Sequence, residues 1–123
     1  MEVKSIRGFL DKGKKYVELG NSVQASEKLY KAAEEAVKAL AQAHANGTWK
    51  EAEEKGRWTS PLLFKAVVEI ARSLRNEEIR KYWAVAWTLH VEGFHEARLD
   101  IDYIREELGD IEKLVKLVET NKG

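Results

Sequence analysis

The sequence predicts an all-α protein, folded as a single-domain antiparallel bundle of about five helices over residues 1–123. Apolar residues recur at spacings of three and four in several separate segments, as they do on the buried face of a helix. No segment combines alternating β-branched residues with hairpin turns, which would indicate a sheet. A chain of 123 residues has the size of one domain with one hydrophobic core.

The longest uncharged run lies in a helix expected from Ile79 to Arg98. Ten consecutive residues, Tyr82 to Val91, carry no formal charge, although 34% of the chain is charged. Ten helical residues extend about 15 Å, which is half of a membrane core, so a buried central helix is expected instead of a membrane span. The helical spacing places Trp83 and Trp87 on its buried face.

Capping and turn residues mark the ends of four further helices. Asn21 or Ser22, and Asp100 or Asp102, are suited to cap a helix start, and Pro61 is favoured in the first turn of a helix. Gly13 lies on the apolar stripe of the first helix, which indicates a close approach by another backbone. Residues 46–59 mix tryptophan with many charges and are expected to form a loop. The expected helices cover residues 3–19, 23–45, 60–75 and 101–118.

Composition excludes several kinds of site. The 21 basic and 21 acidic residues give zero net charge, so no general attraction to nucleic acid is expected, and a local contact stays open. Cysteine, zinc-type histidine spacing and glycine-rich phosphate loops are absent, so no metal and no cofactor are predicted. The absence of cysteine, of a secretory leader and of a membrane span predicts a cytoplasmic protein. The large proportion of Lys and Glu is typical of proteins from thermophiles, so a thermophilic source is expected.

Two histidines near the end of the central helix are the first candidates for chemistry. In an α-helix His90 and His95 would point about 140° apart, so they are not expected to share a ligand. His90 falls on the tryptophan face and is expected to be a hydrogen-bonded core histidine. His95 has Glu92 three residues before it and Arg98 three residues after it, so these three side chains are expected to share one polar patch.

This patch supplies the candidate binding site, which consists of Glu92, His95, Glu96 and Arg98 together with Trp58 from the long loop. Arginine can hold an anionic group through two hydrogen bonds, and tryptophan can stack on a base. Glu92 is placed to orient the His95 imidazole. The alternative is structural: His95 and Arg98 tie the central helix to the last one, and Trp58 covers one end of the bundle. No residue is assigned a catalytic role.

The first helix has a modest excess of basic residues. It contains five basic and three acidic side chains before residue 19. Such a surface could meet an acidic partner, or it could be ordinary solvated surface. The basic residues are Lys4, Arg7, Lys12, Lys14 and Lys15.

Three blocks of the sequence resemble one known family. They are residues 24–36 (Gln-Ala-Ser-Glu-Lys-Leu-Tyr-Lys-Ala-Ala-Glu-Glu-Ala), 56–59 (Gly-Arg-Trp-Thr) and 89–99 (Leu-His-Val-Glu-Gly-Phe-His-Glu-Ala-Arg-Leu). These blocks strongly resemble the archaeal PaREP family of small proteins without an assigned activity. The resemblance spans nearly the whole chain, and its third block is the most specific.

The resemblance implies a HEPN-like helical fold, because the PaREP family looks like a branch of the HEPN superfamily. Members of that superfamily commonly form dimers, and various members bind nucleotides, accompany nucleotidyltransferases or cleave RNA. The ribonuclease members carry an arginine followed by a histidine after four to six residues. None of the histidines here, His44, His90 and His95, follows an arginine at that distance.

Three hypotheses follow from the residues and the resemblance together. The first is a homodimeric, non-catalytic module that binds a nucleotide or a protein partner such as a nucleotidyltransferase-like protein. The second is a nucleotide- or RNA-processing enzyme that uses His95, Glu96 and Arg98. The third is a purely structural protein that masks another chain.

Overall fold

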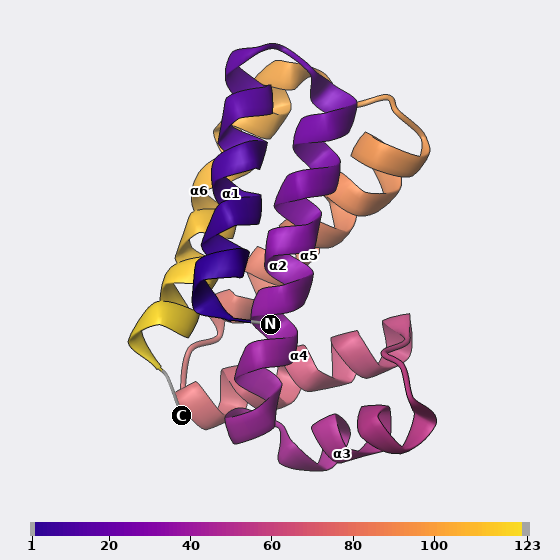
Figure 1. The fold of residues 1–123 in the computed structure, drawn as a ribbon, viewed down its shortest axis with the longest axis vertical. Helices are drawn as coiled ribbons and strands as arrows, with labels where there is room; N and C mark the ends of the chain where they lie inside the picture. The colour runs from indigo at the N-terminus through magenta and orange to yellow at the C-terminus, as the bar shows by residue number, and fades with distance from the viewer. Residues whose placement is uncertain (1, 122–123) are drawn as a thin grey trace.

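The computed structural model describes residues 2–121, and this part of the chain contains six α-helices, one π-helix and no strand. The all-α prediction is confirmed, and the predicted number of about five helices is too low by one. Figure 1 shows α1, α2 and α6 along the long axis of the molecule, with α3 and α4 at one end of it. The elements are α1 (Val3–Glu18), α2 (Ser22–His44), α3 (Asn46–Lys55), α4 (Ser60–Leu74), α5 (Glu78–Thr88), the π-helix η1 (Leu89–His95) and α6 (Ile101–Thr120).

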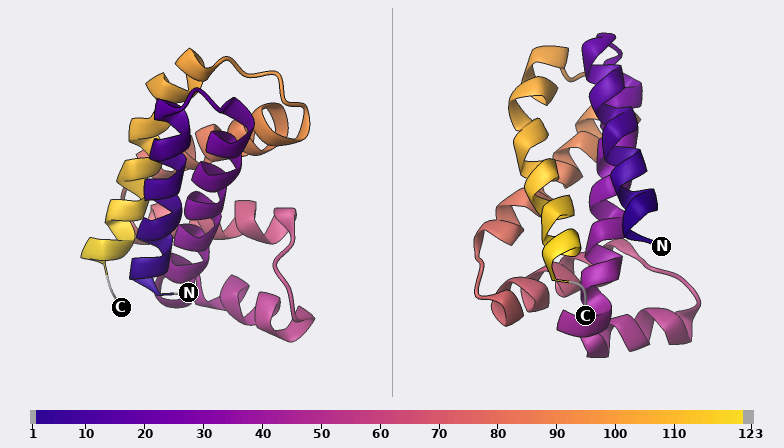
Figure 2. Two further views of the ribbon diagram at one scale, coloured as in Figure 1. Left: turned by 45° about the horizontal axis from the view of Figure 1, so that its top comes forward. Right: turned by 60° about the vertical axis from the view of Figure 1, so that its left-hand side comes forward.

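Helix α2 is the element against which all the others pack. It contacts α1, α3, α4, α5, η1 and α6, and Figure 2 shows it between α1 and α5. The uncharged run predicts instead that the helix at residues 79–98 is the central element of the bundle. That prediction is wrong because small side chains, not large ones, allow neighbours to approach from several sides. The fully buried alanines of α2 are Ala25, Ala32, Ala33, Ala36 and Ala41.

The predicted helix starts are confirmed by capping hydrogen bonds. The amide of Gln24 donates to the Asn21 side chain at 3.1 Å, which satisfies a free N–H at the start of α2. The amide of Asp102 donates to the Asp100 side chain at 2.9 Å at the start of α6. These local signals are readable from sequence because each involves residues two or three positions apart.

Helices α1 and α2 form a tight hairpin at Gly13. A Cβ atom on Gly13 would lie 2.5 Å from Leu29 Cδ2 and 3.3 Å from the backbone nitrogen of Leu29. The close approach predicted at Gly13 is therefore confirmed, and its partner is α2.

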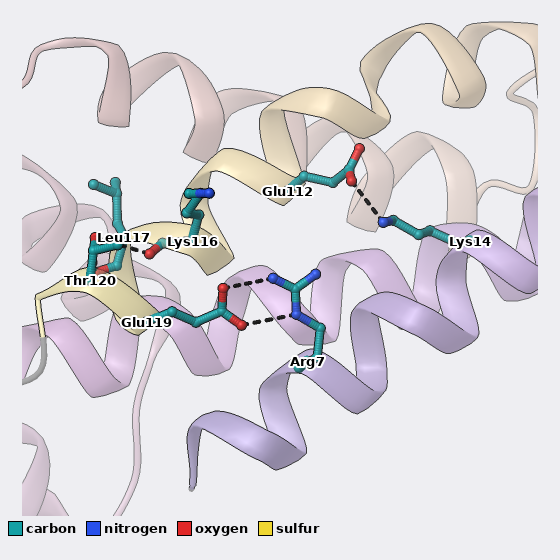
Figure 3. Close-up of polar contacts among 7 residues, drawn as sticks. All are labelled: Arg7, Lys14, Glu112, Lys116, Leu117, Glu119 and Thr120. Atoms are coloured by element: carbon teal, nitrogen blue, oxygen red, sulfur yellow. Dashed lines mark hydrogen bonds and ion pairs between the residues drawn. The ribbon is translucent and has the colours of Figure 1, made fainter.

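Helix α6 lies along the other side of α1, and ion pairs join the two helices (Figure 3). The Arg7 guanidinium donates two hydrogen bonds to the Glu119 carboxylate, at 2.9 and 2.6 Å. Lys14 Nζ lies 2.7 Å from Glu112 Oε2. Two of the basic side chains of α1 thus face α6, and they are neutralised there.

Residues 46–55 form helix α3, where a loop was predicted. The buried face of this helix is short and consists of Ala45, Thr48 and Ala52 at helical spacing. It is difficult to recognise in the sequence because most of the neighbouring residues are charged. The Thr48 hydroxyl donates a hydrogen bond to the Glu69 carboxylate on α4, which joins the two helices. Trp49 is half-buried and packs against the core, in agreement with a covering role at the end of the bundle.

Helix α5 buries one of its two tryptophans fully. Trp83 is 1% exposed and lies in the core, as predicted. Trp87 is only half-buried, so the prediction that it is a core residue is wrong. It lies one turn further along α5 and packs edge-on against Phe64, which is itself 41% exposed at the edge of the bundle. Within residues 2–121, no helix is long and apolar enough to cross a membrane.

Candidate functional site

The end of α5 changes from an α-helix to a π-helix, η1, over residues 89–95. At its end the amide of Glu96 donates to the carbonyl of Val91 at 2.9 Å, a bond between residues five apart. Gly93 lets this wider turn lie directly on α2, because a Cβ there would come within 2.1 Å of Ser26 Oγ and 2.6 Å of Ser26 Cβ. A π-turn of this kind is rare, and it frequently marks a functional site.

The π-turn brings the two histidines together. The ring centroids of His90 and His95 are 4.5 Å apart, in an edge-on arrangement. The expected separation of about 140° assumed an α-helix, whereas residues five apart lie on the same side of a π-helix. His90 also stacks on Tyr30 of α2, with ring centroids 4.1 Å apart and planes 22° apart. The candidate site is therefore built on a cluster of aromatic rings that joins η1 to α2.

A groove of about 330 Å³ opens beside this ring cluster, between α1, α2 and η1. Four aromatic side chains line it, one from α1, one from α2 and two from η1. Three charged side chains of α2 complete the lining. The lining residues are Phe9, Glu27, Lys28, Tyr30, Lys31, His90 and Phe94.

The two lysines at the groove differ in how they are paired. Lys28 Nζ lies 2.9 Å from Glu27 Oε1. Lys31 Nζ lies 3.7 Å from Glu34 and 3.6 Å from Glu35, beyond ordinary hydrogen-bond distance, and its side chain is 41% exposed. Both carboxylates bind Lys38 more closely, at 2.8 and 3.0 Å. Lys31 thus keeps hydrogen-bond donors for an anion in the groove.

The Tyr30–His90 stack is held in its neutral form. Burial lowers the pKa of His90, and the neighbouring His95 lowers it further, against a smaller opposite effect of Glu34. Burial together with Glu34 and Glu35 raises the pKa of Tyr30. Near pH 7 the Tyr30–His90 stack is therefore uncharged, which suits it to stack on a flat, neutral ring.

Glu92 binds Arg98, not His95. The Arg98 guanidinium donates from Nη2 to Glu92 Oε2 at 3.1 Å and from Nε to Oε1, and the Arg98 amide donates to the Glu92 carbonyl at 2.9 Å. The hydrogen bonds to Arg98 lower the pKa of Glu92. The helix ends at His95, and Ala97 turns the chain with a φ of 52°. His95 and Arg98 therefore do not share one helical face as expected, and Glu92 does not orient the imidazole.

The other two candidate residues lie apart from the ring cluster. Glu96 is exposed on the connection from η1 to α6. Trp58 is half-buried against the core on the connection from α3 to α4. Figures 1 and 2 show these two connections at opposite ends of the molecule. The structure thus separates Trp58 from His95, Glu96 and Arg98.

The residues at the groove are not arranged for a metal ion. Across residues 2–121, no group of three or more His, Cys, Asp and Glu side chains is placed to hold one. The carboxylate of Glu34 on α2, which acts on His90, is bound by Lys38 at 2.8 Å.

The sequence pattern of the archaeal PaREP1/PaREP8 family matches residues 2–115. The chain belongs to this family. The match includes every residue of the groove and the whole of η1.

Two solved structures are similar to this PaREP1/PaREP8 chain in sequence and in fold. A crystal structure of a protein from Sulfolobus solfataricus has 40% sequence identity and a TM-score of 0.84, and the alignment covers 94% of each chain. A solution structure, named as the Orf c02003 protein, has 41% identity and a TM-score of 0.80, over 94% of this chain and 90% of the other. No curated protein matches the chain.

Sequence reasoning missed the groove of this PaREP1/PaREP8 protein, because none of the five residues predicted for the binding site lines it. Tyr30 is read as part of the buried side of the second helix, and it is indeed 8% exposed, but its ring also forms one wall of the groove. His90 was expected to be hydrogen-bonded in the core and instead stacks on Tyr30. The signal for His90 was the third block of the family resemblance, which begins at Leu89 together with the π-turn, and Tyr30 lies in the first block.

Proposed function

We propose that this protein is a non-catalytic nucleotide-binding module, and that the groove between α1, α2 and η1 holds the base. The observation that carries the proposal is the neutral Tyr30–His90 stack, which lines an open groove with Lys28 and Lys31 beside it. A volume of about 330 Å³ falls at the lower end of the range for small-molecule pockets, roughly 300–1,000 Å³.

The groove offers one kind of contact for each part of a nucleotide. Phe9, His90 and Phe94 present aromatic surface on which a base can stack, and each such contact contributes about 1–3 kcal/mol. Lys31, which is only loosely paired, supplies donors for a phosphate. A base and a phosphate held at the same groove distinguish a nucleotide from a purely apolar ligand.

Binding is favoured over turnover by what the side chains already contact. Arg98 is engaged by Glu92, and no hydrogen bond or ion pair within residues 2–121 joins His95 to Glu96 or Arg98. A catalytic base is commonly oriented by a third group within hydrogen-bond reach, and the second hypothesis is supported less well because that contact is missing from the described part of the chain. The alternative is a nucleotide- or RNA-processing enzyme that uses His95, Glu96 and Arg98.

The proposal includes a HEPN-like fold and a homodimer that works in the cytoplasm of a thermophilic archaeon. The family resemblance supports the fold and the dimer, and the exposed aromatic edge at Phe64 and Trp87 offers an apolar face for a second copy. Light scattering at micromolar concentrations is expected to give about 28 kDa, which is twice the 14.1 kDa of one chain. A mass of one chain throughout that range contradicts the dimer. A nucleotidyltransferase-like partner would bind to this dimer.

The experiment that tests the nucleotide site is calorimetric titration with the four nucleoside monophosphates. His90→Ala is expected to weaken binding about tenfold or more, because one stacking surface is lost. Tyr30→Phe is the matched control: it keeps the ring and removes only the hydroxyl, so the affinity should change less than about twofold. Unchanged binding by His90→Ala, or no binding of any of the four by the wild type at millimolar concentration, overturns the proposal.

A further inference from the structure

The basic residues of α1 divide into two groups in the structure. Arg7 and Lys14 face α6 and are paired with its carboxylates (Figure 3). Lys12 and Lys15 are exposed, and neither forms an ion pair or a hydrogen bond with residues 2–121. The basic excess of the first helix is thus concentrated on the side away from α6.

A second groove, of about 490 Å³, lies at these two lysines. It is lined by three lysines, one aromatic ring and one leucine, and no carboxylate is among its lining residues. Its leucine, Leu19, is 66% exposed, which is unusual for a large apolar side chain. The lining residues are Lys12, Lys15, Tyr16, Leu19 and Lys28. This composition joins strong positive charge to an accessible apolar surface.

The two grooves adjoin each other. Lys28 lines both of them, on α2. On α1, Phe9 lines the first groove, and Lys12, Tyr16 and Leu19 follow at helical spacing along the same side into the second. The two grooves together form a continuous track. Along it lie the aromatic side chains of the first groove, then the shared Lys28, then Tyr16 of the second groove.

We propose that this track binds a single-stranded oligonucleotide of at least two nucleotides. One base stacks in the first groove, and the second base rests on Tyr16 and Leu19. The phosphates of the strand lie at Lys12 and Lys15, which have no ion-pair partner within residues 2–121, and beside Lys28, which is paired with Glu27 in the free protein. This inference rests on the proposed nucleotide site and extends its ligand from a nucleotide to a strand. Alternating aromatic platforms and basic side chains are the usual means by which proteins hold single strands.

Tyr16 and Leu19, the apolar residues of the second groove, favour one ligand over others that carry the same charge. A chain of phosphates on a single nucleotide would use the lysines and leave Tyr16 and Leu19 without a partner, whereas a second base covers both. A duplex presents its bases stacked inside, so it cannot use either platform. An acidic peptide would satisfy the lysines and supply no flat ring for Tyr30 and His90.

The test is fluorescence anisotropy with a labelled penta-adenylate strand at about 50 mM salt, beside calorimetry with AMP. Lys12→Gln/Lys15→Gln should weaken pentanucleotide binding about fivefold or more and leave AMP binding unchanged. Removing two phosphate contacts should also reduce the slope of log K against log salt by about 1.4. The matched control is Lys113→Gln/Lys116→Gln, which removes the same charge from α6, outside both grooves, and should leave both affinities unchanged.

Failure of this inference differs from failure of the nucleotide site. If AMP binds but the pentanucleotide binds no more tightly than AMP, the proposal of a single-stranded ligand is wrong and the nucleotide site stands. The same holds if Lys12→Gln/Lys15→Gln leaves the affinity for the pentanucleotide unchanged. Equal affinity for a duplex, or for an Asp- and Glu-rich peptide of the same charge, also overturns the single strand. Absence of binding by both AMP and the pentanucleotide overturns both proposals.

Discussion

Replacing Gly93 by alanine tests how η1 is held against α2. The new Cβ would lie 2.1 Å from Ser26 Oγ, 2.6 Å from Ser26 Cβ and 3.3 Å from Leu99 Cδ1. Rotation of the Ser26 hydroxyl relieves the first contact, but the Cβ of Ser26 is fixed to the backbone of α2. Ordinary van der Waals contact begins at 3.4 Å, so η1 must move away by about 0.8 Å (3.4 minus 2.6).

The cost of this movement can be bounded. Overpacking of a core contact costs about 1–3 kcal/mol, and alanine regains up to about 1 kcal/mol over glycine in a helix. A net loss of about 1–2 kcal/mol is expected for Gly93→Ala. For a domain of this size that corresponds to a fall in melting temperature of roughly 4–8 °C, measured by circular dichroism. Because η1 carries His90, AMP binding should weaken as well.

A double variant separates this mechanism from a general loss of helix stability. Ser26→Gly removes the Cβ that the new methyl group meets, so Ser26→Gly/Gly93→Ala should be more stable than the sum of the single changes predicts, by about 1 kcal/mol. Strict additivity of the two changes, or a Gly93→Ala variant as stable as the wild type, would refute the reasoning about this contact.

Three further outcomes are expected from the structure. Trp83→Ala should lower the free energy of unfolding by about 3–5 kcal/mol and Trp87→Ala by clearly less, in urea titrations; equal losses would place both rings in the core. Folding lowers the pKa of His90, so below about pH 6.5 the unfolded chain binds more protons than the folded chain. The stability that His90 contributes is therefore complete above that pH and is lost as the pH drops toward the folded pKa. Melting curves from pH 7.5 to 5 should show this fall, and His90→Gln should reduce it; an unchanged fall would assign it to other groups. Gly13→Ala should lower the free energy of unfolding by about 1–2 kcal/mol, and this loss should be smaller when it is measured in a Leu29→Ala background. An equal loss in both backgrounds would show that Leu29 does not obstruct the new methyl group.

The fold was largely predictable because its signals are local. The caps at Asn21 and Asp100 involve residues two or three positions apart, and the stripe that includes Gly13 repeats with the period of a helix. Helix α3 was missed because its buried side chains, Thr48 among them, are few and small beside many charges. Its helical state depends on contacts with α4, such as the hydrogen bond from Thr48 to Glu69, which no local pattern reveals.

The sequence directed attention to the end of the central helix, but it predicted neither the groove nor the geometry of the histidines. The residues at 90–98 do mark an unusual turn, but reasoning from 3.6 residues per turn placed His90 and His95 apart and joined His95 to Arg98. The π-turn reverses both relations, and it lies on α2 through the contact between Gly93 and Ser26, two residues 67 positions apart (93 minus 26). Tyr30 could not be assigned to the site, because its stacking partner His90 is 60 positions away in the sequence (90 minus 30).

The π-helix η1 also has a consequence for how this family can vary. A π-turn behaves as an α-helix that carries one inserted residue, so a single deletion between 89 and 95 would restore the regular winding. With one residue removed between them, His90 and His95 would stand four positions apart, about 40° from each other on an α-helix, so the two rings would stay on one face. The π-turn thus accommodates one extra residue while the ring pair is kept. A variant that lacks Val91 should retain the through-space NMR contact between the two imidazoles, and loss of that contact would show that the pair requires the wider turn.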